Sequence, residues 1–81
     1  MTSLPNTIGA VNAEIMTLQK QYQNLNSTIK SYISLMSKPD IDPDTLRQMC
    51  ETRIEFIRRR NNIAEHINEL SKHRALLTAF P

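Results

Sequence analysis

Between Ile8 and Met36, apolar residues recur at alternating intervals of three and four without interruption. This is the spacing of the a and d positions of a coiled coil, which form one continuous apolar strip along an α-helix. The pattern therefore predicts a long helix over residues 6–37, with Asn6 or Thr7 as its N-cap. The strip consists of Ile8, Val11, Ile15, Leu18, Tyr22, Leu25, Ile29, Tyr32 and Met36.

The same spacing returns after a break that is marked by Pro39 and Pro43. Asp42 suits an N-cap and Pro43 suits the first helical position, so we predict a turn over residues 38–42 and a helix over 43–78. The second apolar strip consists of Leu46, Met49, Phe56, Ile63, Ile67, Leu70 and Leu77. Its remaining positions are all arginines, namely Arg53, Arg60 and Arg74.

The two strips match when the helices run antiparallel. Leu46 then falls opposite Met36, and Ile63 falls opposite Leu18, so the register holds along the whole length. We expect an all-α, single-domain, antiparallel two-helix hairpin that resembles a coiled coil, roughly 45 Å long for about 30 residues per helix. A chain of 81 residues buries little in such a hairpin, so we expect oligomerisation or a partner to complete it.

The register also assigns a facing residue to each arginine of the second strip: Ile29 to Arg53, Tyr22 to Arg60 and Ile8 to Arg74. Each arginine could lay its methylene stem along the strip and turn its guanidinium group to water, and Arg60 could also stack on Tyr22. The alternative is that the arginines face acidic groups on another subunit.

Apolar residues off the strips widen the apolar surface near the turn. They suggest a second contact surface, used either to form a four-helix bundle by dimerisation or to dock on a larger partner. Cys50 lies beside the strip in the same region, where a small buried hydrophobe is its most common role. With the neighbouring basic run, the candidate partner surface consists of Ile33, Leu35, Ile54, Ile57, Arg58, Arg59, Arg60, Leu76 and Phe80.

The residues that enzymes need are scarce in this chain. A single glycine cannot build a glycine-rich phosphate loop, and a single cysteine cannot form a disulfide within the chain. Two parallel strips form no cleft for a catalytic triad. His66, Glu69 and His73 share one helical face, but solvent-facing residues take this spacing freely. We therefore predict no enzyme activity and no catalytic, cofactor-binding or metal-binding residue.

A basic nucleic-acid-associated dimer is an alternative, because Arg58, Arg59 and Arg60 are consecutive. Against it, Glu55 is placed to form helix-surface ion pairs with Arg58 and Arg59, and the net charge is only +2. No apolar run approaches the ~20 residues of a membrane span, and the first residues lack the pattern of a signal peptide. We therefore expect a cytoplasmic protein without a membrane span.

The turn Ser37-Lys-Pro-Asp-Ile-Asp-Pro-Asp-Thr-Leu46, followed by Gln48, resembles the Lys-Pro-x-x-Pro-x-Leu-Leu turn of type III secretion needle subunits. The apolar ending Leu76-Leu-Thr-Ala-Phe-Pro81 also looks like the end of those chains. The small helical-hairpin co-chaperones of the same systems fit about as well. The resemblance implies a hairpin that polymerises into a tube or is sheathed by a chaperone before export, through a route that needs no signal peptide.

The function that the residues themselves favour is broader. We predict a non-enzymatic protein–protein interaction module that self-associates or docks as a small subunit of a larger assembly.

Overall fold

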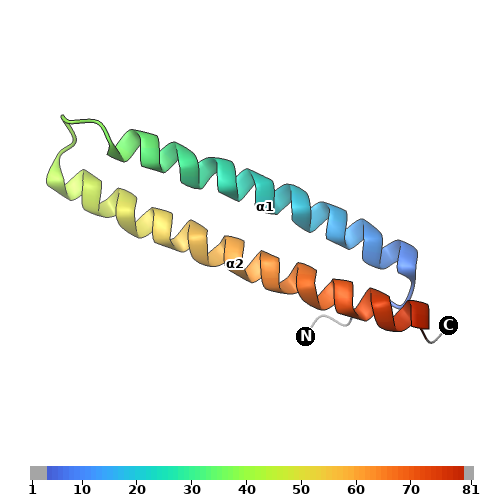
Figure 1. The fold of residues 1–81 in the computed structure, drawn as a ribbon. Helices are drawn as coiled ribbons and strands as arrows, with labels where there is room; N and C mark the ends of the chain where they lie inside the picture. Colours follow the sequence, from blue (N-terminus) through green and yellow to red (C-terminus); the bar gives the residue numbers. More distant parts are fainter. Residues whose placement is uncertain (1–3, 80–81) are drawn as a thin grey trace.

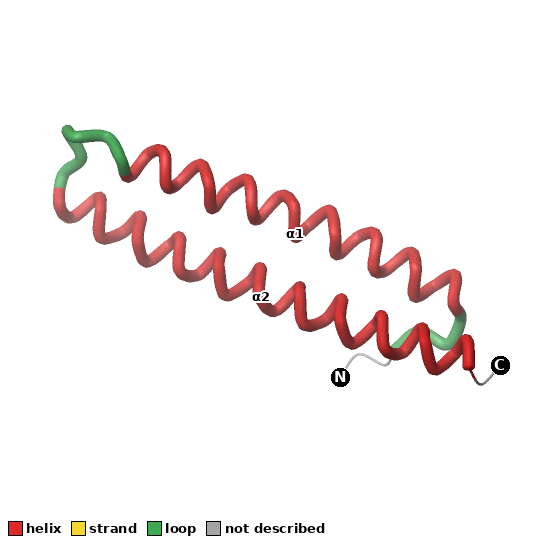
Figure 2. Tube along the Cα trace, in the orientation of Figure 1, coloured by secondary structure: helices red, strands yellow, loops and turns green. Residues whose placement is uncertain are grey.

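A computed structural model describes residues 4–79 of the chain. It contains the helices α1, Ile8–Met36, and α2, Pro43–Ala79, which run antiparallel and side by side (Figure 1). A short loop joins them at one end of the molecule, and the described part of the chain holds no strand (Figure 2). The prediction of an all-α antiparallel hairpin is confirmed.

Both helices begin at residues whose side chains cap them. Thr7 has an extended backbone and its Oγ1 accepts a hydrogen bond from the Ala10 amide at 3.2 Å, so α1 begins two residues later than predicted. Asp42 Oδ2 accepts from the amides of Asp44 and Thr45 at 3.1 and 3.2 Å. These bonds satisfy amides that have no partner within the first turn of a helix, and they explain where each helix starts.

The best buried part of the hairpin lies towards its open end, away from the turn. Val11 and Leu70 are fully buried there beside Ile15, and Leu18, Ile67 and Leu77 pack against this group. Most of the other strip residues are half-buried, with Ile29 a further buried position. The hairpin therefore has a core only one residue wide, as expected where each helix can bury a single strip.

Ile8 departs from the predicted strip, because 42% of its surface is exposed. It is the first residue of α1, and the side chain of Arg74, which the register places opposite it, contacts Asn12 instead. The Arg74 side chain is therefore directed to Asn12 and not to Ile8.

An aromatic pair contributes to the packing nearer the turn. The rings of Tyr32 and Phe56 lie 5.8 Å apart between centroids, tilted by 40°. Tilted aromatic pairs at this distance are favourable. The pair ties the two helices together in a part of the hairpin where few residues are fully buried.

The molecule is a rod of 59 × 21 × 14 Å with a radius of gyration of 17.5 Å. A compact domain of this length would have a radius of about 12 Å. The rod is longer than the predicted 45 Å because α2 alone has 37 residues, which span about 55 Å at 1.5 Å each. Neither helix contains a stretch that is long and apolar enough to cross a membrane, as far as residues 4–79 are concerned.

Candidate functional site

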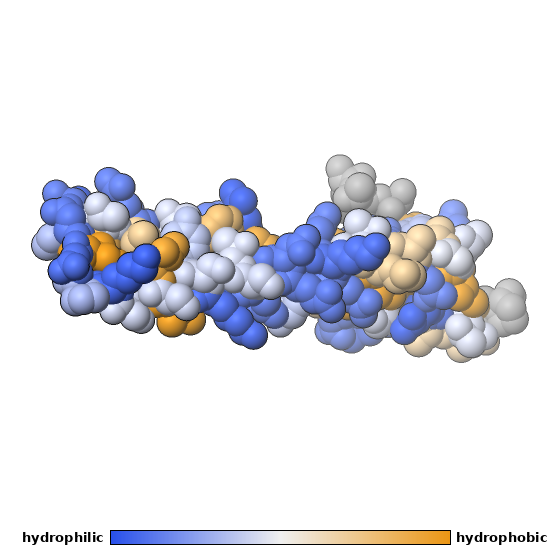
Figure 3. Space-filling model, turned by 90° about the horizontal axis from the view of Figure 1, so that it is seen from above, coloured by the Kyte–Doolittle hydropathy of each residue, from blue (hydrophilic) through white to orange (hydrophobic). Residues whose placement is uncertain are grey.

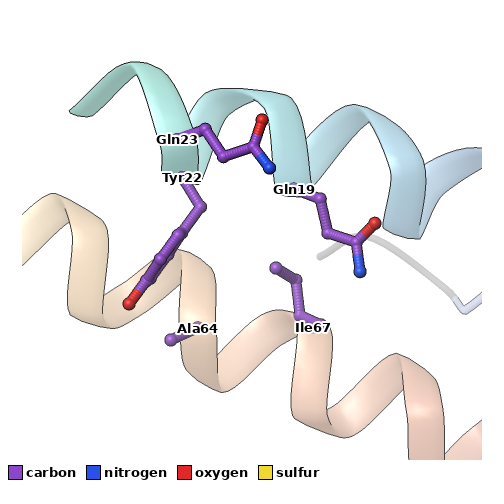
Figure 4. A pocket seen from close by; sticks show the side chains of 5 residues that line it. All are labelled: Gln19, Tyr22, Gln23, Ala64 and Ile67. Atoms are coloured by element: carbon purple, nitrogen blue, oxygen red, sulfur yellow. The ribbon is translucent and has the colours of Figure 1, made fainter. Parts of the chain in front are cut away.

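A shallow groove follows each side of the contact between the helices. One groove, of about 430 Å³, is lined by Gln19, Tyr22, Gln23, Ala64 and Ile67. Figure 4 shows Tyr22 reaching from α1 towards α2 beside Ala64, while Ile67 points back towards α1. The groove on the other side, of about 480 Å³, is lined by Gln21, Asn24, Leu25, Arg59, Asn62 and Ile63.

Each groove marks one long face of the hairpin. Residues seven apart lie on the same side of a coiled-coil-like helix, so the lining residues show which other residues belong to each face. The first face carries five cations and, among the described residues, no carboxylate. We call it the arginine face, and its cations are Lys30, Arg47, Arg53, Arg60 and Arg74. The net charge of +2 conceals this concentration of positive charge.

The opposite face carries the carboxylates Glu14, Glu55 and Glu69, and we call it the glutamate face. Its one arginine, Arg59, lies 3.7 Å from Glu55, and Arg58 lies 3.2 Å from the same carboxylate. The predicted ion pairs of Glu55 are therefore confirmed. Two cations of the basic run are thus already partnered on the surface of α2.

The arginine face has polar contacts between the helices. Arg60 Nη1 donates to Asn26 Oδ1 at 3.0 Å, and Arg74 Nη1 donates to Asn12 Oδ1 at 2.8 Å. The register places Tyr22 opposite Arg60 and Ile8 opposite Arg74. Each acceptor lies four residues after that facing residue in the sequence. Side chains on a helix lean towards its N-terminus, which displaces each guanidinium group by one turn.

The sequence left open a stacking of Arg60 on Tyr22, and the structure instead gives its guanidinium group hydrogen-bond partners. Its guanidinium group bonds to Asn26 and, through Nη2, to Asn61 Oδ1 at 3.4 Å. The one cation–π contact within residues 4–79 places Arg59 over the ring of Phe56 at 5.9 Å. Arg60 is only half-exposed, so its head remains in the groove between the helices.

Arg53 lacks the asparagine that the other two arginines use. The same one-turn displacement directs it to Ile33, whose side chain offers no acceptor. Its Nε is buried and has no hydrogen-bond partner among the described residues, which is also true of Arg60 Nε. No ion pair joins Arg53, Arg60 or Arg74 to a carboxylate in that part of the chain.

Exposed apolar residues accompany Arg53 at the turn end of the arginine face. Ile33 and Ile54 expose 47% and 55% of their surface, and Met16 exposes 59% on the same face further from the turn. Ile57 and Cys50 are half-buried beside Ile54. Figure 3, which looks down on α1, shows hydrophobic residues gathered near the turn and again towards the open end.

The remaining residues of the predicted partner surface are not brought together. Leu35 lies on the glutamate face near the turn, whereas Leu76 is exposed near the opposite end of the rod. Phe80 lies outside the described residues. The structure thus divides the predicted surface between two faces and two ends of the hairpin.

Both histidines take part in contacts between α2 and the N-terminal part of the chain, which the sequence reasoning missed. His66 Nε2 lies 3.2 Å from Glu14 Oε1, and His73 Nε2 donates to the Pro5 carbonyl at 2.7 Å. Register alone could have indicated the first pair, because Glu14 and His66 fall almost opposite each other. Within residues 4–79, no three His, Cys, Asp or Glu side chains gather as metal ligands would.

Comparisons with models of protein families, with curated proteins and with solved structures find no match to this chain. The two faces are therefore interpreted from their own residues and contacts.

Proposed function

We propose that this chain is a non-enzymatic protein–protein interaction module, a helical hairpin that self-associates or docks as a small subunit of a larger assembly. The observation that carries the proposal is the surplus of exposed surface. The hairpin exposes 6174 Å², whereas a compact monomer of 9.3 kDa exposes about 5000 Å². The excess is comparable to the ~800 Å² that each partner buries in a standard protein interface.

The small core supports the same proposal. Among residues 4–79, only Val11, Ile15, Ile29 and Leu70 are buried, while several large apolar side chains remain exposed on both helices. Burial of apolar side chains is the dominant stabilising contribution to a fold. A hairpin with so narrow a core gains stability when another chain covers its exposed apolar residues.

Thermal unfolding at low micromolar concentration, combined with light scattering, tests the proposal. We expect either an assembly larger than one chain or a monomer that unfolds at low temperature with weak cooperativity. A monomer that unfolds cooperatively and at high temperature would show that the hairpin needs no other chain, and it would overturn the proposal.

A further inference from the structure

We propose that the arginine face, at its turn end, binds an acidic amphipathic helix of another protein, which completes a three-helix bundle. This inference rests on the proposed interaction function and specifies the partner's chemistry. The centre of the site is Arg53 with Ile33 and Ile54, which are contributed by both helices beside the turn.

Charge complementarity is the first reason for an acidic partner. Four of the five cations of the arginine face, Lys30, Arg53, Arg60 and Arg74, form no ion pair with a carboxylate within residues 4–79, whereas Arg47 lies 3.7 Å from Asp44. Surfaces of opposite charge favour association and select against the wrong partners. A helix bearing glutamate or aspartate therefore suits this face.

Arg53 is the second reason. Asn26 and Asn12 satisfy part of the guanidinium groups of Arg60 and Arg74, but the equivalent position for Arg53 is occupied by Ile33. Its Nε is buried without a partner within residues 4–79. A carboxylate on a docked helix can approach the outer edge of this guanidinium group and form the charge-assisted hydrogen bonds that the hairpin does not supply.

The spacing of the cations indicates that the acidic segment is helical. Arg53 and Arg60 are seven residues apart, and Arg74 lies fourteen residues beyond Arg60 on the same face of α2. Seven residues rise about 10 Å along a helix. A helix that docks alongside α2 presents carboxylates at the same interval when they recur once in each heptad.

The exposed apolar residues supply anchors for the apolar side of that helix. Ile54 and Ile33 flank Arg53, and Met16 lies further along the same face. Apolar anchors surrounded by polar contacts are typical of stable interfaces between helices and grooves. This arrangement suits an amphipathic helix better than the uniformly charged backbone of a nucleic acid.

A second copy of this chain fits the arginine face poorly. Two arginine faces in contact would bring ten cations together, and of the five on each face only Arg47 has a carboxylate, that of Asp44, within ion-pair distance among the described residues. Like charges that are brought together in an interface oppose association. The occupant that matches both the charge and the apolar residues is an acidic helix.

The test is a fluorescence anisotropy titration of the full chain with a synthetic three-heptad helical peptide. The peptide carries leucine at its a and d positions and glutamate at the flanking positions, and a matched peptide carries lysine in place of every glutamate. We expect the glutamate peptide to bind at least about tenfold more tightly than the lysine peptide, because only the former complements the arginine face.

Two variants locate the binding site. Arg53→Gln keeps most of the apolar stem but removes the charge, and Ile54→Asp places a carboxylate on the exposed anchor. We expect each to weaken binding by about tenfold, a loss typical of central interface residues. Leu76→Asp is the matched control, because Leu76 exposes 58% of its surface, close to the 55% of Ile54, but lies on the other face. It should leave binding unchanged, and circular dichroism should show the same helicity for all three variants.

Four results would overturn the inference. Equal binding of the two peptides would exclude charge recognition, and an equal effect of Leu76→Asp would place the site elsewhere. Tighter binding of a short DNA duplex than of the glutamate peptide would assign the face to a nucleic acid. A dimer that dissociates upon the Ile54→Asp substitution would assign the face to a second copy.

Failure of this inference is distinguishable from failure of the interaction function itself. A chain that is marginally stable alone but does not bind the glutamate peptide would leave the interaction function standing, with a different partner. A highly stable monomer would remove the interaction function, whatever the result with the peptide.

Discussion

Arg60 on α2 donates a hydrogen bond to Asn26 on α1 over 3.0 Å, one helical turn beyond Tyr22, the residue that the register places opposite it. The same displacement relates Arg74 to Asn12. Two of the three arginines within the α2 strip are thus accommodated by asparagines on the facing helix. The hairpin holds these two cations between its helices.

Substitution of Asn26 by alanine tests the contribution of this bond. The Asn26→Ala variant leaves the half-buried guanidinium group of Arg60 without its interhelical acceptor, so we expect the free energy of unfolding to fall by about 1 kcal/mol. Urea unfolding followed by circular dichroism measures the change. Asn62→Ala, at an exposed position that forms no such bond, is the control and should change it by less than about 0.5 kcal/mol.

Arg53 allows the opposite experiment, in which an acceptor is added. Ile33→Asn places an asparagine where the one-turn displacement directs Arg53, whereas Ile54→Asn makes the same chemical change at an exposed site on α2 itself. We expect Ile33→Asn to be more stable than Ile54→Asn by about 1 kcal/mol in urea unfolding, because it provides a new hydrogen bond. Equal stability of the two variants would show that Arg53 does not reach one turn beyond its facing residue, as Arg60 and Arg74 do.

The core near the open end should dominate the stability of the hairpin. Leu70 is fully buried, and Leu70→Ala should lower the free energy of unfolding by about 3 kcal/mol, which is enough to abolish cooperative unfolding of so small a domain. Leu76→Ala removes the same atoms from an exposed site and should cost less than about 0.5 kcal/mol. Thermal unfolding curves of the two variants provide the measurement, and similar curves would place the core elsewhere.

The contact between His66 and Glu14 is suited to a double-mutant cycle. Both side chains are partly exposed, so their coupling should be only about 0.5 kcal/mol, as is usual for surface pairs. The cycle compares His66→Ala, Glu14→Ala and the double variant in urea unfolding. Strictly additive effects would show that the 3.2 Å contact contributes nothing to stability.

The cap of α2 provides a further prediction. Asp42 accepts two amide hydrogen bonds, so Asp42→Ala should destabilise the hairpin by about 1 kcal/mol. Asp40, which lies in the same turn and is exposed, is the control for the loss of a negative charge. If Asp40→Ala lowered the unfolding temperature equally, the effect would be one of charge and not of capping.

The two helices and their hairpin arrangement could be predicted from the sequence because the signals are local. An unbroken three-and-four spacing, an Asp-Pro helix start at Asp42 and a glutamate one turn before two arginines each depend on neighbouring residues alone. These features are present in the structure as predicted. The resemblance of the turn to secretion needle subunits stays a prediction, since no comparison bears on it.

The features that could not be predicted depend on side-chain direction and on contacts between distant residues. Register counts backbone positions, whereas a long arginine side chain leans one turn along its helix before it finds Asn26 or Asn12. The contact between His73 and the Pro5 carbonyl likewise joins α2 to a residue outside both helices. The sequence also places the cations and the carboxylates on separate faces. That division can be recognised only once the two helices are placed side by side.

The antiparallel path brings the beginning of α1 and the end of α2 to one end of the rod, and the turn stands at the other (Figure 1). A fluorescent protein, a solid support or a further domain joined before α1 or after α2 would therefore lie most of the 59 Å length away from Ile33, Arg53 and Ile54. In such a fusion the hairpin would hold these residues well clear of the attached group. Immobilisation through a group placed before α1 or after α2 should consequently leave the turn end open to a binding partner.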